Sequence, residues 1–327
     1  MKKEILEKSP KVIGEFLGYM QTVKGKSQKT IEEYYIDLRT FFRYMKIKWK
    51  LVDQDTALEE INICDVNIDN IKTIKLLDVF EYMNYLISER KNTASTRSRK
   101  VSSLRSFFKF LTNKTGQLDI NPIEELETPK KKKSLPRFLT LDQSKMLLNV
   151  VNQYGGSNKE RDYCIITLFL NCGMRLSELV GMNINDVRKD GTLKITGKGD
   201  KERIIYINDA CKAAIDRYLY VRPNDRAKDK NAMFISRNNN RISPKTVQFL
   251  LNRYLTLSGL QGQGFSVHKL RHTAATLMYQ YGEVDIRILK DILGHENLGT
   301  TEIYTHLSNQ QMQDAVKANP LSDIKID

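Results

Sequence analysis

The segment TPKKKKSLP (residues 128–136) divides the chain into two parts whose sequence patterns differ. Two prolines enclose four lysines there. Proline disfavours the continuation of a helix, and neighbouring lysines repel one another, so we expect an extended, solvated linker. We therefore predict two domains, over residues 1–127 and 137–327. A polybasic linker beside a nucleic-acid groove would also neutralise phosphate charge.

The part before the linker has the apolar spacing of α-helices almost throughout. Ser9, followed by Pro10, and Ser27 are each expected to cap the start of a helix. Further helices are predicted over residues 76–90 and 94–111. Aromatic residues recur on one face of these helices and are expected to form the core.

The last of these helices also carries a group of basic residues. Arg97, Arg99, Lys100 and Arg105 fall within it. A solvated basic face explains them, and so does a helix that lies along DNA phosphates. The sequence leaves both interpretations open.

After the linker the pattern changes to mixed structure. Thr140 and Gln143 resemble a capping box that opens a helix. Residues 192–196 and 203–207 have the composition of short strands, and Gly197 begins the turn between them, which predicts a β-hairpin. We expect a mainly α protein with one small β-hairpin, an α+β fold. Its further helices are predicted over 161–171, 210–220, 244–257, 269–281 and 286–293.

The charge balance favours a polyanionic partner. The sequence has 53 Lys+Arg against 39 Asp+Glu, a formal net charge of +14. Nucleic acid and an anionic membrane surface both fit this excess, whereas a small molecule explains it poorly. No long basic amphipathic helix is apparent, which disfavours the membrane.

The sequence also predicts a cytoplasmic location. No apolar stretch reaches the roughly 18 residues that a membrane span needs, and the N-terminus lacks the apolar core of a secretion signal. The four cysteines lie far apart without a CxxC pair, so we expect reduced thiols and neither a zinc site nor disulfides.

The segment SVHKLRHT (residues 266–273) is a candidate phosphate site. A helix that starts near His268 would place His268, Arg271 and His272 on one face. Backbone N–H groups at a helix N-terminus favour an anion, and these side chains donate hydrogen bonds. A surface basic cluster would have the same composition.

Two earlier segments carry weaker signals. In NCGMRLSEL (171–179), Arg175 follows a glycine break, and Glu178 could hold the polar groups of a site in place, although an ordinary surface ion pair is an alternative. Lys198 is expected at the tip of the hairpin, where it could protonate a leaving oxygen or be simply solvated. The spacing of a phosphate-binding Walker loop is absent.

The segment LGHENLGTTEIYTH (293–306) places His295 nine residues before Tyr304. A tyrosine hydroxyl is a poor nucleophile at neutral pH, because its pKa is about 10. Nearby arginines and histidines would stabilise the phenolate and the charge that develops on phosphorus. Most tyrosines in such segments serve only in packing.

In their order along the chain, these segments resemble the tyrosine recombinase (lambda integrase-like) family, and most closely its Xer-type site-specific recombinases. GMRLSEL, TGKGDKER, HKLRHT and LGHENLGTTEIYTH each stand where the family has its motif, and no catalytic position departs from the pattern. The similarity runs from about residue 27 to residue 304 and on into the tail. It includes residues 27–30 and 104–111 in the N-terminal part.

The resemblance implies a metal-independent DNA strand transferase without a cofactor. Tyr304 would attack the scissile phosphate, form a 3′-phosphotyrosyl link and release a 5′-hydroxyl. Arg175 and Arg271 would clamp the non-bridging oxygens, and Lys198 would be the general acid for the leaving oxygen.

The remaining polar residues of the motifs would assist. By the same resemblance, His268 assists proton transfer at the tyrosine and His295 hydrogen-bonds the phosphate. Glu178 supports the arginines, and His272 and His306 are supporting residues.

The resemblance also implies the architecture and the partners. A helical core-binding domain and a catalytic domain would form a C-shaped clamp on double-stranded DNA that carries a specific site. The active assembly would be a homotetramer, or a heterotetramer with a related recombinase, and the tail over 310–327 would pack on a neighbouring protomer. Candidates for DNA contact are Arg97, Arg99, Lys100, Lys201, Arg203, Lys245 and Lys269.

Two other functions use parts of the same features. A type IB topoisomerase-like enzyme would nick and close DNA without exchange, and a DNA-binding regulator would have no chemistry. The N-terminal helices favour a recombinase, and a regulator would not need Tyr304. The sequence leaves open whether the enzyme resolves chromosome dimers or integrates a mobile element.

Overall fold

The computed structural model describes residue 5 and residues 7–53, 55–129, 137–197, 202–282 and 284–294. The chain divides into two compact units, Met1–Lys133 and Ser134–Asp327. Each unit has its own hydrophobic core. The mainly α fold with one small hairpin is confirmed. Of the linker predicted over residues 128–136, residues 130–136 lie outside the described residues.

The first unit is built from helices. Ser27 accepts a hydrogen bond from the backbone of Thr30 at the start of α3, as predicted for a cap. The cap predicted at Ser9 is wrong, because the Ser9 hydroxyl donates to the Ile5 carbonyl and Pro10 occupies the capping position of α2. The helices are α2 (Lys11–Thr22), α3 (Gln28–Lys48), α4 (Ile68–Lys72), α5 (Leu76–Ser88) and α6 (Ala94–Asn113), with a 3₁₀ turn η1 (Leu58–Glu60).

Aromatic side chains join α2, α3 and α6 in the core of this unit. Phe107 of α6 is fully buried. Its ring meets Phe16 edge-on at 5.4 Å between centroids and meets Phe42 in the same manner at 5.7 Å. Edge-to-face packing of this kind adds to the energy of burial. The predicted aromatic core is therefore present.

A buried carboxylate also connects α3 to α6. Asp37 accepts hydrogen bonds from Lys100 Nζ at 3.1 Å, from Ser103 Oγ at 2.8 Å and from Arg99. The side chains of Asp37 and Lys100 are 0% and 8% exposed, whereas that of Arg99 is 43% exposed. Lys100 thus points into the unit, and Arg99 reaches the surface. A buried charge is tolerated only where such partners compensate its lost hydration.

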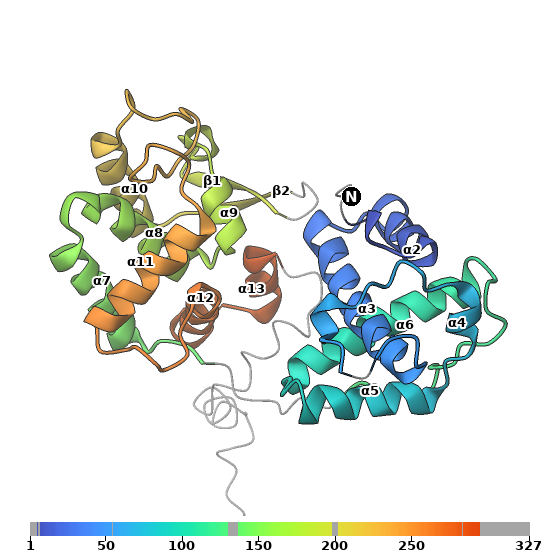
Figure 1. Ribbon diagram of the computed structural model, residues 1–327. Coiled ribbons are helices and arrows are strands. Elements are labelled where there is room, and N and C mark those ends of the chain that lie inside the picture. The colour runs from blue at the N-terminus through green and yellow to red at the C-terminus, as the bar shows by residue number, and fades with distance from the viewer. Residues whose placement is uncertain are drawn as a thin grey trace, which may run out of the picture. The chain divides into compact units, whose positions relative to one another are not determined.

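The second unit surrounds one central helix. Almost every turn of α8 is buried, and α7, α10 and α12 pack around it (Figure 1). The capping box predicted at Thr140 and Gln143 is present at the start of α7. The helices are α7 (Leu141–Tyr154), α8 (Lys159–Cys172), α9 (Leu176–Gly181), α10 (Asp209–Val221), α11 (Pro244–Leu257), α12 (Val267–Tyr281) and α13 (Ile286–Leu293), with 3₁₀ turns η2 (Gly156–Asn158) and η3 (Ile184–Asp186).

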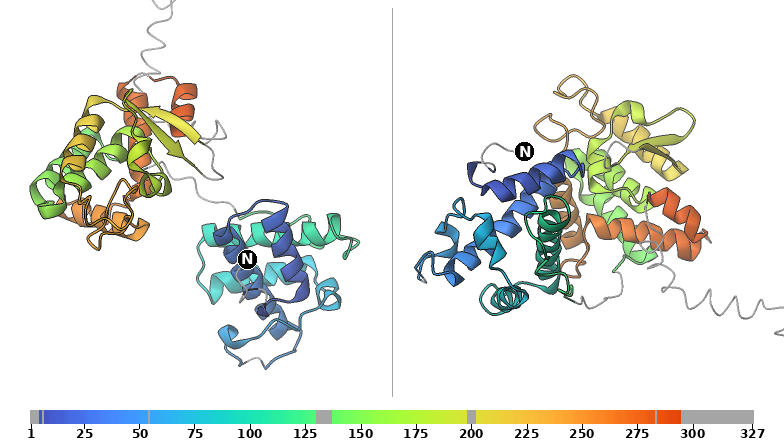
Figure 2. Two further views of the ribbon diagram at one scale, coloured as in Figure 1. Left: turned by 90° about the horizontal axis from the view of Figure 1, so that it is seen from above. Right: turned by 90° about the vertical axis from the view of Figure 1, so that its right-hand side faces the viewer.

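The predicted hairpin is formed by β1 (Thr192–Thr196) and β2 (Glu202–Tyr206). The strands are antiparallel, with Thr192 opposite Tyr206 and Thr196 opposite Glu202. Figure 2 shows them side by side, extending from the helical body of the unit.

Within the described residues, no helix combines the length and the apolarity needed to cross a bilayer. All four cysteines are free thiols; Cys64 is exposed and the other three are buried. The same part of the chain holds no group of three or more side chains suited to a metal ion.

The Asp37 network provides a test of the first unit. Replacing Asp37 by Ala leaves Lys100 buried without its carboxylate, so we expect the free energy of unfolding to fall by about 3–5 kcal/mol. Trp49, the single tryptophan, packs against the core of this unit, and its fluorescence during urea unfolding of the full chain measures the change. Glu59→Ala is the control: it breaks the exposed ion pair with Arg90 and should leave the urea midpoint of unfolding unchanged. Equal midpoints for Asp37→Ala and wild type would contradict the network's importance.

Candidate active site

Arg175 is placed by a tight break between α8 and α9. Gly173 ends α8 with a left-handed backbone (φ 58°), and Arg175 caps the start of α9. A Cβ atom on Gly173 would lie 2.7 Å from Leu293 Cδ2. Both the backbone angle and the close approach of Leu293 therefore require glycine at this position.

Glu178 is the buried carboxylate beside Arg175. Its side chain is 1% exposed. It accepts hydrogen bonds from the Arg175 backbone at 2.7 Å and from Arg175 Nη1 at 2.8 Å, and from Arg203 Nη1 and Nη2 at 2.7 and 3.0 Å. Burial alone would raise the pKa of Glu178, but the hydrogen bonds from Arg203 and Arg175 lower it to about 2. The carboxylate is therefore charged at neutral pH.

Arg271 enters the same cluster from α12. It is 2% exposed. Its Nη1 donates to the Gly173 carbonyl at 2.8 Å, and its Nη2 donates to the Leu293 carbonyl at 2.6 Å. The planar guanidinium is thus fixed by acceptors on two other segments.

The end of α13 provides acceptors for all three arginines. Arg203 Nε donates to the Ile292 carbonyl at 3.2 Å, and Arg175 Nη2 donates to the Gly294 carbonyl at 2.8 Å. Together with the bond from Arg271 to Leu293, these contacts use three consecutive carbonyl groups. The C-terminal carbonyls of a helix carry partial negative charge, so they suit guanidinium groups.

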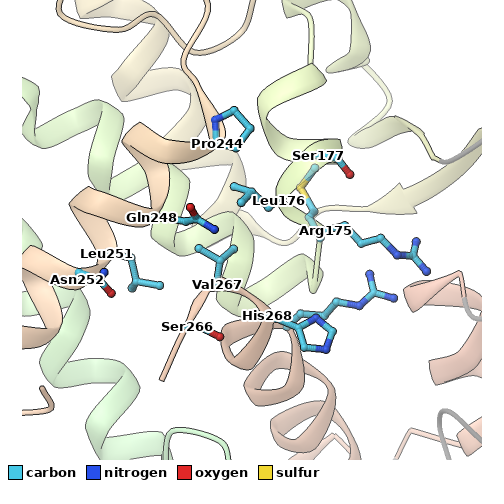
Figure 3. Close-up of a pocket in the computed structure, with 12 residues that line it drawn as sticks. Arg175, Leu176, Ser177, Pro244, Gln248, Leu251, Asn252, Ser266, Val267 and His268 are labelled. Atoms are coloured by element: carbon cyan, nitrogen blue, oxygen red, sulfur yellow. The ribbon is translucent and has the colours of Figure 1, made fainter. Parts of the chain in front are cut away.

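A pocket of about 640 Å³ opens beside this cluster. Arg175, His268 and Arg271 line it, together with Gln248 and Leu251 of α11. Figure 3 shows Arg175 and His268 on one side of the pocket and the α11 side chains on the other. Two arginines and a histidine around one cavity have the hydrogen-bond donors that an anion such as a phosphate requires.

His268 lies in the first turn of α12, and Ser266 caps the start of this helix. Partial burial, and then the nearby charges of Arg271, Lys269 and Arg175, lower the pKa of His268 below 6.5. The imidazole is therefore neutral at pH 7 and can accept a proton. The ring of His272, one turn further along, meets it edge-on at 4.6 Å between centroids.

The structure brings together Arg175, Glu178, His268, Arg271 and His272 in the second unit. The other candidates for catalysis or DNA contact, Lys198, Lys201, His295 and Tyr304, lie outside the described residues, as does His306.

The remaining candidates for DNA contact differ in exposure. Arg99 and Lys245 are exposed, and Arg97 and Lys269 are partly exposed. Lys100 is buried against Asp37. Arg203 is held within the arginine cluster, a position that its sequence context did not indicate, because a basic residue in a hairpin is typical of a solvated surface.

The lowered pKa of Glu178 predicts a pH-dependent contribution to stability. The folded pKa lies below the ordinary 4.5, so the stabilisation is present above pH 4.5 and is lost as the pH falls towards 2. We expect wild type to exceed Glu178→Gln by about 3 kcal/mol at pH 7 and by much less at pH 3. Urea unfolding followed by circular dichroism measures this, and Trp49 fluorescence separates the transition of the first unit. A difference that is the same at both pH values would contradict the prediction.

Comparison with known proteins shows two family matches along the chain. Residues 137–311 match the phage integrase family, and residues 13–116 match the N-terminal SAM-like domain of phage integrases. The tyrosine recombinase XerC of Caldanaerobacter subterraneus subsp. tengcongensis is 50% identical over 315 residues, which cover 96% of this chain and 88% of the relative. The tyrosine recombinase XerC of Thermodesulfovibrio yellowstonii is 32% identical over 317 residues, covering 95% and 96%.

Solved structures share the fold. The site-specific recombinase XerH bound to a palindromic difH substrate has a TM-score of 0.69 at 18% identity, with 94% of each chain covered. A lambda integrase dimer bound to a core site has a TM-score of 0.64 at 19% identity, covering 90% of this chain and 75% of that chain. The chain belongs to the phage integrase family and is a tyrosine site-specific DNA recombinase.

Proposed function

We propose that Tyr304 is the nucleophile of this recombinase and that the pocket beside Arg175, Arg271 and His268 receives the scissile phosphate. The observation that supports this most directly is the convergence of two arginines, from α9 and α12, on one cavity that also contains a neutral histidine. Tyr304 would attack phosphorus, form a 3′-phosphotyrosyl bond and release a 5′-hydroxyl. A second 5′-hydroxyl can reverse the step, because the covalent bond conserves the phosphodiester energy.

The arginines would stabilise the charge on the two non-bridging oxygens. Phosphoryl transfer requires mainly positioning and electrostatic stabilisation, and donors that are fixed in advance cost no reorganisation during the reaction. Arg175 and Arg271 are fixed in this way by Glu178 and by main-chain carbonyls. Each guanidinium has five N–H donors, so one held by two protein acceptors can also donate to a phosphate.

Proton transfers would involve His268 and Lys198. The neutral imidazole of His268 is suited to accept the tyrosine proton. Lys198, which follows β1 by two residues in the sequence, would protonate the leaving 5′-oxygen. His295, which follows α13 directly, would hydrogen-bond the phosphate, while Glu178 and His272 would support the site. No metal or nucleotide takes part in this scheme.

The two units would have different functions. The helical unit before the linker would bind the DNA core site, and the unit after it would carry out the chemistry. Arg97, Arg99, Lys201, Lys245 and Lys269 remain the candidates for contact with the DNA backbone.

The active form of the enzyme would be a tetramer on synapsed double-stranded DNA. The tetramer would contain four identical chains, or this chain together with a related recombinase. A solved lambda integrase tetramer bound to a Holliday junction has a TM-score of 0.62, which supports the fold's capacity for this arrangement. The XerC relatives favour an Xer-like exchange at a specific site. The resolution of chromosome dimers and the integration of a mobile element both fit such an exchange, and either would take place in the cytoplasm.

The nucleophile is tested with a suicide substrate, a nicked duplex that carries candidate recombination sites. Wild type should form a covalent protein–DNA adduct that denaturing electrophoresis detects, and Tyr304→Phe should form none. Tyr281→Phe is a matched control, since Tyr281 is an exposed tyrosine of the same unit, and its adduct should equal that of wild type. Equal adducts with wild type and Tyr304→Phe would refute the assignment.

The tail is tested by deleting residues 311–327. If the tail docks on a neighbouring protomer, recombination between two sites should fall, whereas binding to a single site should persist. A two-site recombination assay beside a gel-shift assay measures both. Unchanged recombination by the truncated chain would refute the role of the tail.

A further inference from the structure

Arg203 of β2 is the one arginine of the cluster that the proposed chemistry does not use. Its side chain is only 16% exposed. Both terminal nitrogens donate to the Glu178 carboxylate, at 2.7 and 3.0 Å, and Nε donates to the Ile292 carbonyl at 3.2 Å. Each nitrogen of the guanidinium therefore has a protein acceptor.

Arg203 also packs closely on the backbone at the end of α13. Gly294 has a left-handed backbone (φ 64°), and a Cβ atom there would lie 3.1 Å from Arg203 Cδ and 3.2 Å from Nε. The side chain thus spans the distance between the hairpin, α9 and α13. Each of these elements leads directly into a proposed catalytic group: Lys198 follows β1 by two residues, Arg175 caps α9, and His295 follows Gly294.

We propose that Arg203 is a positioning residue, which holds the hairpin and the end of α13 in register with Arg175 through Glu178. This inference rests on the proposed function, because it assigns Arg203 a part in the same reaction. Loss of the guanidinium would free the hairpin from Glu178 and free α13 from the hairpin. Arg175, Arg271 and Lys198 would then no longer be held at fixed positions relative to one another.

A role in direct DNA contact fits the geometry less well. Arg203 already donates three hydrogen bonds inside the protein, and its side chain is 16% exposed against 40% for that of Arg175. A phosphate on the edge of the guanidinium that faces Glu178 would have to displace a carboxylate that is 1% exposed. The displaced carboxylate would lose compensation for its buried charge, which is costly. Lysine could not replace Arg203, because one ammonium cannot make a bidentate pair with a carboxylate and also reach the Ile292 carbonyl in this planar arrangement.

The two roles differ in which step of the reaction they affect. We measure the single-turnover rate of adduct formation at saturating protein, and separately the DNA affinity as a function of salt. For Arg203→Gln, a positioning role predicts a rate lower by about 10- to 100-fold, with affinity and salt slope unchanged. A phosphate contact predicts the reverse: weaker binding, a salt slope smaller by about one, and an unchanged saturating rate.

Matched variants separate charge from geometry. Lys194→Gln removes a positive charge from β1 of the same hairpin, where Lys194 pairs with Glu202 at 2.6 Å, and should leave the rate unchanged. Arg203→Lys keeps the charge but not the bidentate geometry and should be as slow as Arg203→Gln. If Arg203→Gln does not fold, as judged by circular dichroism, Arg203→Lys provides the test. The double variant with Glu178→Gln should be slowed by less than the product of the two single effects, because the two residues share one contact.

A substrate with sulfur in place of the 5′-bridging oxygen isolates the contribution of the hairpin. A thiolate leaves without general-acid assistance, so this substrate should restore part of the rate of Arg203→Gln relative to wild type. A purely structural loss of folded protein would slow both substrates equally and would overturn the inference.

The outcomes also distinguish the inference from the proposed function. A wild-type rate for Arg203→Gln, or a defect in affinity alone, would overturn the positioning role while wild-type adduct formation through Tyr304 still stands. A wild type that forms no adduct, or one that forms without Tyr304, would refute the proposed function and the inference with it.

Discussion

Three consecutive carbonyl groups at the end of α13 accept hydrogen bonds from arginines that come from α9, α12 and the β-hairpin. The buried carboxylate of Glu178 accepts hydrogen bonds from two of these arginines, Arg175 and Arg203. The other features of the site depend on this convergence. Gly173 allows Leu293 to approach, α8 provides the rigid support on which α12 packs, and the hairpin is tied to the cluster through β2.

The cluster concentrates the positive charge of three arginines. Arg175 and Arg203 share the buried carboxylate of Glu178, and Arg271 donates to the Gly173 and Leu293 carbonyls. The main-chain carbonyls supply the rest of the compensation through their dipoles. A site arranged in this way remains electropositive towards its pocket, and it attracts an anion without a large rearrangement of the protein.

Local chemistry made much of the fold predictable, since caps and apolar spacing act within a few residues. Ser27 and Thr140 begin helices as expected. Ser9 does not, because its hydroxyl bonds to the preceding turn. The motifs located Arg175, Glu178, His268 and Arg271 in one site.

Contacts between residues distant in the sequence were not predictable from it. Arg99 and Lys100 are adjacent basic residues that both pair with Asp37 of α3, yet only Lys100 is buried, because its position on α6 faces the interior of the unit. The pairing of Arg203 with Glu178 also depends on how a hairpin packs against a helix. Main-chain acceptors leave no mark in the sequence, so the role of Ile292, Leu293 and Gly294 could emerge only from the structure.

The use of main-chain carbonyls has a consequence for how freely this segment can diverge. Every amino acid supplies the same carbonyl group, so substitution at Ile292 leaves its acceptor for Arg203 in place as long as the backbone path is kept. Leu293 and Gly294 are more restricted, since Leu293 packs against Gly173 and Gly294 adopts a left-handed angle beside Arg203. Variation around the site is therefore limited by shape and backbone path rather than by the chemical identity of side chains. Libraries that aim to retarget the enzyme could diversify neighbouring surface positions while these two residues are kept constant.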